Sequence, residues 1–413
     1  MSDHALEMFG RTRTSDGAPS WLTRRLVDKV LSGLASLESG TLKLHLPDGT
    51  QHTLGRGTPM LQVQIHRWET FRRILWEQDI GAGESYAEGW WDTNDLAQLC
   101  RLFVRADSAL WNQRSVVKSL LRLPRAVSWA LQRNTRSGSR RNIAHHYDLS
   151  NDFYRLFLDS SLTYSCALFD PPSLSLEQAQ HAKLEFVCRQ LGIQPGERVL
   201  EIGCGWGSFA LHAAKHFGAF VHGISLSQKQ LELARERCSA AGISDQVRLD
   251  FLDYRDLTGT YDHVVSIEMF EAVGHEYYPA FFTAVDRCLR PGGKFFLQTI
   301  TIPDQRYDAY RREFDFIKKH IFPGGLLASL HRILWATKHY TQLRLLFFRD
   351  IGPHYARTLR TWREQFLQHL PQVQALGFDR YFTRLWEFYL ASCEAAFAAA
   401  HIGDAQLIFE RRA

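Results

Sequence analysis

A short glycine-rich run, EIGCGWG at 201–207, is the part of this sequence that most clearly predicts ligand chemistry. An apolar stretch with strand character precedes it at 198–202, and a stretch with helical spacing follows at 208–217. Glycines in such a turn let the backbone approach a ligand closely. The spacing is GxGxG after an acidic residue and lacks the third glycine of GxGxxG, so it differs from the pyrophosphate-binding fingerprint of dinucleotide enzymes.

The run is similar to motif I of the class I S-adenosylmethionine methyltransferases. Asp253-Tyr254, after a predicted strand at 247–251, and the turn LRPGG at 289–293 extend the similarity. It implies S-adenosylmethionine as the cofactor. The second predicted strand ends in GISLS at 223–227 without the acidic residue that commonly binds the ribose, so we expect Gln230 and neighbouring backbone to bind the cofactor hydroxyls.

Helical and strand patterns alternate from about residue 174 onward. We predict helices at 176–191, 208–217, 228–241 and 278–289, and strands at 198–202, 220–224, 247–251, 263–267 and 294–300. This order predicts an α/β fold, a doubly wound Rossmann-like parallel sheet that binds its ligand at the carboxyl ends of the strands. We expect 341–349 and 405–411 to form the final, antiparallel strands. An aromatic-rich insertion at 302–335 is either a structural cap or a lid that forms one wall of an acyl channel.

The first part of the chain has a different pattern, with helices expected at 22–37 and 68–76 and strands at 41–46 and 60–66. We therefore predict a smaller N-terminal α+β domain at 1–110, which would handle lipid, a linker at 111–145, and the methyltransferase domain at 146–413. A length of 413 residues with 45% hydrophobic residues excludes a disordered chain or a disulfide-rich miniprotein.

Positive charge is concentrated in the predicted linker. The formal net charge is +5, from 49 Lys and Arg against 44 Asp and Glu, yet no acidic residue occurs between Asp107 and Asp148. Eight basic residues lie there: Arg114, Lys118, Arg122, Arg125, Arg133, Arg136, Arg140 and Arg141. The segment is either a solvated linker helix or, at 114–141, a surface that docks on anionic lipid headgroups. No nucleic-acid recognition motif accompanies the charge.

The cysteine pattern indicates reduced thiols, and the hydropathy pattern bears on the compartment of the protein. The seven cysteines are scattered without a CxxC pair, and we find neither a membrane-spanning apolar run nor a signal-peptide pattern. We expect a cytoplasmic protein that associates peripherally with the inner face of the cell membrane. Adjacent His145 and His146 are poorly placed to bind one tetrahedral ion, so no metal site is predicted.

Five ordered motifs identify a family. YSCA at 164–167, the run at 201–207, GISLSQKQ at 223–230, MFEAVG at 269–274 and IFPGG at 321–325 together resemble the cyclopropane-fatty-acyl-phospholipid synthases, and also the mycolic acid cyclopropane synthases. The resemblance extends from about residue 140 to the C-terminus, and more loosely through the first domain. It implies transfer of a methylene group from S-adenosylmethionine to the cis double bond of an unsaturated phospholipid acyl chain.

The resemblance also implies site residues. In this family a bound bicarbonate is the base that removes a proton as the ring closes. The polar groups around it correspond here to Cys166, Glu271, Gln298, the backbone of Ile300, and Tyr355. The cofactor residues implied are Tyr164, Ser165, Glu201, Gly203, Cys204, Gly205, Gly207, Ser225, Leu226, Gln230, Tyr254 and Arg255. A homodimer is left open.

Gln298 departs from the bacterial pattern, in which a histidine commonly occupies this position. Glutamine can hydrogen-bond an anion but carries no charge and shuttles no proton. A relative that forms methyl- or methylene-branched chains, or methylates a small amine, therefore stays open, as does a lipid carrier without catalysis. Cys166 could be only a packed thiol, Glu271 a helix-start carboxylate and Tyr355 a core aromatic residue.

Overall fold

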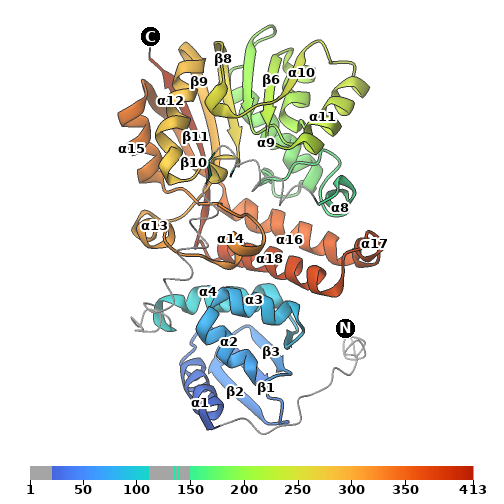
Figure 1. Cartoon of the computed structure of the whole chain (residues 1–413), viewed down its shortest axis with the longest axis vertical. Helices are drawn as coiled ribbons and strands as arrows, with labels where there is room; N and C mark the ends of the chain where they lie inside the picture. Colours follow the sequence, from blue (N-terminus) through green and yellow to red (C-terminus); the bar gives the residue numbers. More distant parts are fainter. Residues whose placement is uncertain (1–20, 111–133, 136–137, 139–148, 413) are drawn as a thin grey trace. The chain divides into compact units, whose positions relative to one another are not determined.

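The computed structural model describes residues 21–110, 134–135, 138 and 149–412 (Figure 1). The chain divides into two compact units, one made of 1–117 and 378–392 and the other of 118–377 and 393–413. The C-terminal part of the sequence thus contributes a segment to the first unit. Apart from Asn134, Thr135 and Gly138, the predicted basic linker lies outside the described residues, as do His145 and His146.

The smaller unit is built on a four-stranded sheet in the order β2-β1-β3-β4. Its elements are α1 (Trp21–Ala35), β1 (Gly40–His45), β2 (Gln51–Arg56), β3 (Met60–Ile65), α2 (Glu69–Glu77), α3 (Asp79–Ala87), β4 (Trp91–Thr93) and α4 (Leu96–Leu110). Buried and exposed residues alternate strictly along β3, as expected for a strand with one face on a core. Arg384 of α18 (Arg380–Ala398) ties its segment to this unit, donating to the Tyr86 carbonyl at 2.6 Å and to Asp92 at 2.7 Å.

The larger unit contains a seven-stranded sheet in the order β10-β11-β9-β8-β5-β6-β7. Its strands are β5 (Arg198–Ile202), β6 (Phe220–Ser225), β7 (Val247–Phe251), β8 (Tyr261–Ile267), β9 (Leu289–Thr301), β10 (Leu343–Asp350) and β11 (Gly403–Arg411). The first five of these pair in parallel, and β11 is antiparallel to both β9 and β10. The predicted doubly wound sheet is confirmed, and the two final strands pair antiparallel with each other, β11 lying between β9 and β10. The turn predicted at 290–293 is instead incorporated into β9.

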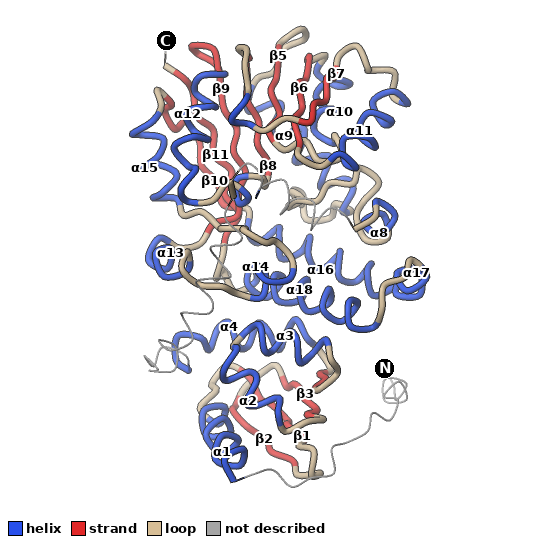
Figure 2. Tube along the Cα trace, viewed as in Figure 1, coloured by secondary structure: helices blue, strands red, loops and turns tan. Residues whose placement is uncertain are grey.

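Helices cover both faces of this sheet, as Figure 2 shows. One apolar core contains α9 (Leu176–Leu191), α10 (Ser208–Phe217) and α11 (Gln228–Ala240); the other contains α12 (Tyr278–Cys288) and α15 (Leu330–Tyr340). Neighbouring strand residues alternate between the two cores: Val264 packs in one and Val265 in the other. Strands buried on both faces have apolar residues in succession, which is why this sheet was recognisable from the sequence.

The larger unit contains further helices. They are α8 (Asn151–Arg155), α13 (Asp304–Tyr310), α14 (Phe316–His320), α16 (Gly352–Gln368) and α17 (Leu370–Ala375), with short 3-10 helices at Tyr254–Asp256, Phe270–Ala272 and His275–Tyr277. The predicted insertion at 302–335 returns to the sheet, because Ile302 donates its N–H to the Ala328 carbonyl and Leu326 donates to the Glu271 carbonyl. The insertion is therefore anchored beside a predicted site residue.

Candidate active site

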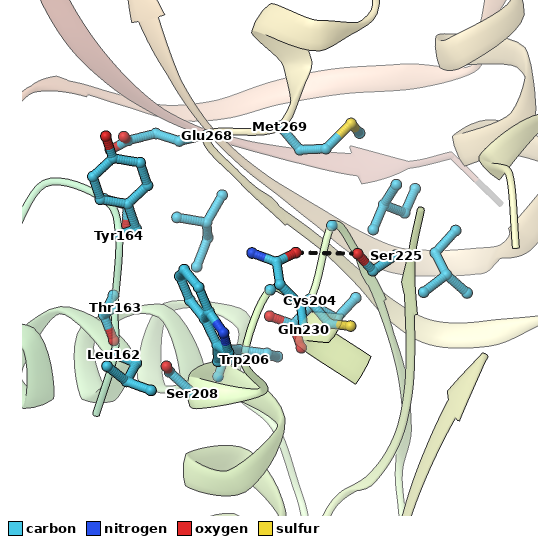
Figure 3. Close-up of a pocket in the computed structure, with 18 of the residues that line it drawn as sticks. Leu162, Thr163, Tyr164, Cys204, Trp206, Ser208, Ser225, Gln230, Glu268 and Met269 are labelled. Carbon is cyan, nitrogen blue, oxygen red and sulfur yellow. Dashed lines mark hydrogen bonds between the residues drawn. The ribbon is translucent and has the colours of Figure 1, made fainter. Parts of the chain in front are cut away.

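A cavity opens at the carboxyl ends of β5, β6 and β8, where the direction of strand succession reverses (Figure 3). This is the place where doubly wound sheets bind their ligands. Ten of the predicted cofactor residues line it: Tyr164, Ser165, Glu201, Gly203, Cys204, Gly205, Ser225, Leu226, Gln230 and Tyr254. Figure 3 shows Glu268 and Tyr164 toward one end of the cavity, and Gln230 hydrogen-bonded to Ser225 in another part.

The glycines of the β5–α10 turn leave room on the cavity side. Gly203 has φ +90°, and a Cβ there would lie 2.6 Å from the Met269 side chain. Gly205 has φ +51°, and the nearest neighbour of a Cβ added there would be the Gln230 amide nitrogen, at 3.9 Å. Both positions favour glycine, and the second exposes the backbone to the cavity. This is the geometry expected of a turn that a cofactor approaches closely.

Glu201 gives this cavity one carboxyl oxygen, Oε2, that has no hydrogen-bond partner among the described residues. The residue is buried and lines the cavity. Burial raises the pKa of Glu201 to about 8. A buried acceptor of this kind normally has a partner. The hydroxyls and ammonium of S-adenosylmethionine provide such donors, so the residues present fit this cofactor.

Two predicted cofactor residues do not line the cavity in the described structure. Gly207 begins α10, with φ +80°, and its missing Cβ leaves space for Ala234 of α11. Arg255 pairs with Asp253, its Nη2 lying 2.6 Å from Oδ2, and also donates to the Asn134 carbonyl. Gly207 therefore serves helix packing, and Arg255 is held beside the cavity rather than in it.

Three of the predicted catalytic residues, Cys166, Gln298 and Tyr355, bind a carboxylate that was not predicted from the sequence, that of Glu268. Its Oε1 accepts hydrogen bonds from the Cys166 N–H at 2.7 Å and from Gln298 Nε2 at 2.8 Å. The Tyr355 hydroxyl donates to Oε2 at 2.5 Å. Glu268 also lines the cofactor cavity, so these three donors surround a group that faces the cofactor site. The segment at 269–274 was recognised, but the residue just before it was not.

Glu271 lies in a second, adjoining cluster. Its Oε1 accepts from the Ile300 N–H at 2.5 Å and from Thr299 Oγ1 at 2.9 Å, whereas its buried Oε2 accepts no hydrogen bond from the described residues. Burial, and then the charge of Glu268, raise the pKa of Glu271 to about 7. The two predicted residues Glu271 and Ile300 are thus brought together, and one carboxylate oxygen is left available.

Lys183 and Asp404 complete the electrostatics of this cluster, and neither was predicted from the sequence. Gln298 Nε2 donates to Asp404 Oδ2 at 3.0 Å, and burial raises the pKa of Asp404 well above its usual range. Lys183 is fully buried, donates to Ser165 Oγ at 2.5 Å, and its charge opposes the burial that raises the pKa of Glu268. The Lys183 ammonium thus interacts with two carboxyl groups of this cluster, those of Glu268 and Asp404.

Cys166 contributes its backbone rather than its thiol to this cluster. The side chain is fully buried, and its Sγ lies 3.7 Å from the Ile351 carbonyl. Burial raises the pKa of the Cys166 thiol well above its usual value, so the thiol stays protonated. A covalent role for this cysteine is therefore disfavoured.

An aromatic wall adjoins the carboxylate cluster. The Tyr164 ring lies 5.1 Å from the Trp362 ring and 6.5 Å from Phe322 of the insertion, between ring centroids. Tyr355 stacks on Phe397 at 4.4 Å. Residues from the 164–167 motif, the insertion and α16 thus pack as an aromatic cluster beside the polar centre, and Tyr164 of this cluster lines the cavity.

Known proteins match most of this chain. The family model described as mycolic acid cyclopropane synthetase matches residues 134–407. The chain is 40% identical over 380 residues to a tuberculostearic acid methyltransferase of Mycobacterium tuberculosis, covering 87% of this chain and 86% of that protein. It is 35% identical over 358 residues to the cyclopropane-fatty-acyl-phospholipid synthase of Escherichia coli, covering 86% and 89%.

A solved structure shows the same fold. The mycolic acid cyclopropane synthase CmaA1, in complex with SAH and CTAB, superposes with a TM-score of 0.62 at 32% identity, covering 66% of this chain and 98% of that one. SAH is S-adenosylhomocysteine, the product that remains after methyl transfer. The family resemblance drawn from the five sequence motifs is confirmed.

Proposed function

We propose, because the chain belongs to the mycolic acid cyclopropane synthetase family, that this methyltransferase adds a methylene group to the cis double bond of an unsaturated phospholipid acyl chain. The observation that carries the proposal is the position of Glu268, which lies in both the cofactor cavity and the carboxylate cluster. A methyl donor and a proton acceptor must both reach the alkene, and this arrangement provides for both.

S-adenosylmethionine supplies an electrophilic methyl group when bound. The turn containing Gly203 and Gly205 and the Glu201 oxygen that lacks a partner among the described residues would hold it, with Ser225 and Gln230 available for its hydroxyls. An alkene is a weak nucleophile, so it must be held in line with the methyl carbon in a site without water. The aromatic wall would exclude water and position the acyl chain for this step. The carboxylates stabilise the positive charge that develops on the alkylated chain.

A second candidate is a lipid methyltransferase whose product is a methyl- or methylene-branched chain. Gln298 leaves this candidate open, because it stands where a histidine is common in bacterial cyclopropane synthases. The 40% identity to a protein named as a tuberculostearic acid methyltransferase agrees with it. The two candidates share the methyl-transfer step and differ in which proton is lost afterwards.

Lipids from cells that express the protein would separate these functions. Ring closure adds one CH2 unit to unsaturated phospholipids, removes olefinic NMR signals and introduces cyclopropane protons. Exomethylene protons, or a methyl branch with retained unsaturation, would establish the second candidate instead. Methylation of small amines without any change in the lipids would contradict both.

The proposal includes a membrane surface as partner. The basic segment at 114–141 would bind anionic headgroups on the cytoplasmic side and bring the chain to its substrate. Within the part of the chain that the structure describes, no helix is long and apolar enough to cross a bilayer. A homodimer stays part of the hypothesis and is testable by sedimentation.

A further inference from the structure

The donors expected to grip bicarbonate are already bonded to a side chain of the protein. Cys166 N–H, Gln298 Nε2 and the Tyr355 hydroxyl all donate to Glu268, at 2.7, 2.8 and 2.5 Å. A carboxylate and a bicarbonate present the same pair of anionic oxygens to hydrogen-bond donors. Glu268 therefore occupies a cradle suited to a single such anion.

Gln298 has no remaining donor for a second anion. Its Nε2 donates to Glu268 and to Asp404, and its Oε1 accepts from Gln406 Nε2 at 2.9 Å. This last bond fixes the orientation of the amide, since Oε1 must face the Gln406 donor. The side chain is fully buried and its hydrogen-bonding groups are satisfied within the protein.

Charge also disfavours bicarbonate. The carboxyl groups of Glu268 and Asp404 already interact with one buried ammonium, that of Lys183, and Glu271 is close enough to raise the pKa of Asp404 further. A further anion would add like charge in a buried site, where such repulsion is strong. Bound bicarbonate was expected from the sequence, but the residues present do not fit it.

The backbone at Glu268 provides an independent observation. Its φ is +48°, in the left-handed region that favours glycine, and it is one of four non-glycine residues with positive φ in the described chain. Such a conformation is unfavourable for a residue with a side chain and persists where that side chain has a function. Glu268 thus places a carboxylate at a position whose backbone conformation favours glycine.

We propose that the Glu268 carboxylate takes the place and the role expected of bicarbonate, so that this chain supplies its own proton acceptor. The proposal rests on the proposed function. A C–C bond forms between the transferred methyl and one alkene carbon while the S–C bond of the sulfonium breaks. A C–H bond of the added methyl then breaks, its electron pair closes the ring, and its proton goes to a Glu268 oxygen.

Three forms of the full-length protein test this with S-adenosylmethionine and vesicles of dioleoyl-phosphatidylethanolamine, in buffer freed of carbon dioxide or supplemented with bicarbonate. The unaltered protein is expected to work equally in both. Glu268→Gly relieves the backbone and empties the cradle, so it should lose at least about 100-fold in rate without bicarbonate and regain activity with it. Glu268→Gln still fills the cradle and should not be rescued.

Ala400→Gly is the matched control, because Ala400 also has a positive φ, +52°, and is exposed. It should leave the rate unchanged. Binding of S-adenosylhomocysteine, measured by calorimetry, should be retained in every variant, which shows that the fold and the cofactor site are intact. Bicarbonate dependence of the unaltered protein, or full activity of Glu268→Gly without bicarbonate, would overturn the proposal.

A binding measurement separates this inference from the proposed function. If no vesicle lipid is methylated under any condition, the proposed function fails. Carbon-13 NMR of labelled bicarbonate still shows whether bicarbonate binds where the Glu268 carboxylate lies. Saturable line broadening with Glu268→Gly and none with the unaltered protein would support Glu268 as the resident anion. Equal binding by both would refute it.

Discussion

The Tyr355 hydroxyl donates a 2.5 Å hydrogen bond to Glu268 Oε2, joining α16 to the residue that follows β8. The two residues are 87 positions apart, and Tyr355 is held from behind by stacking on Phe397. This bond orients the carboxylate whose other oxygen is bound by Cys166 and Gln298. The site is therefore assembled from four separate segments of the chain.

Replacing Tyr355 by phenylalanine tests this bond. The ring and its stacking remain, but a donor to a buried carboxylate is lost, which is worth about 1.5–3 kcal/mol. We expect kcat to fall roughly 10- to 100-fold with little change in the KM for S-adenosylmethionine. Loss of the donor destabilises the anion, so the rising limb of the pH–rate profile should move to higher pH. Tyr340→Phe, at an exposed tyrosine, is the control; an unshifted profile in Tyr355→Phe would contradict the assignment.

The glycine turn makes a prediction about cofactor binding. Gly203→Ala would place a Cβ 2.6 Å from Met269 at φ +90° and distort the cavity. We expect the affinity for S-adenosylhomocysteine to fall at least about tenfold, which corresponds to about 1.4 kcal/mol. Gly196→Ala has nearly the same φ, +86°, and no heavy atom within 4 Å, so it controls for backbone strain alone. An equal loss of affinity in both variants would show that backbone strain, and not the shape of the cavity, causes the effect.

The buried Glu201 carboxyl should make the free energy of unfolding of the cofactor-free protein depend on pH. Its folded-state pKa is raised by burial to about 8 from 4.5, with the Ala210 backbone and Lys183 acting in the opposite direction. A raised folded pKa means that this contribution is complete below pH 4.5 and is lost as pH rises through about 8. Glu201→Gln should therefore flatten the decline in the free energy of unfolding between about pH 5 and 8, by an amount on the order of a few kcal/mol. Denaturant unfolding across this range measures the effect, and exposed Glu236→Gln should not produce it.

Charge in the predicted linker gives a prediction about membranes. Neutralising Arg133, Arg136, Arg140 and Arg141 should weaken binding to anionic vesicles, by up to about 1 kcal/mol for each charge at low salt, and leave binding to zwitterionic vesicles little changed. Vesicle co-sedimentation at two salt concentrations measures this. Four exposed arginines of the described chain serve as the control set: Arg24, Arg56, Arg248 and Arg344. Salt-independent binding by the linker variant equal to that of the parent would refute the docking hypothesis.

Local sequence determined the elements and the cofactor turn of this protein. Residues 176–191, 198–202 and 208–217 form the helix, strand and helix expected, because apolar periodicity, the Ser175–Gln178 capping box and the left-handed glycines all act within a few residues. The predicted cofactor residues Gly203, Cys204 and Gly205 belong to this local strand-turn-helix unit and line the cavity.

Tertiary structure alone decided which groups meet at the reaction centre. Nothing local marks Glu268, Lys183 or Asp404 as parts of one cluster, since their proximity depends on strand order and on burial. The sheet places Asp404 of β11 opposite Ile300 of β9, and burial then sets the protonation of each carboxyl. The sequence predicts the class of chemistry, whereas packing selects the group that accepts the proton.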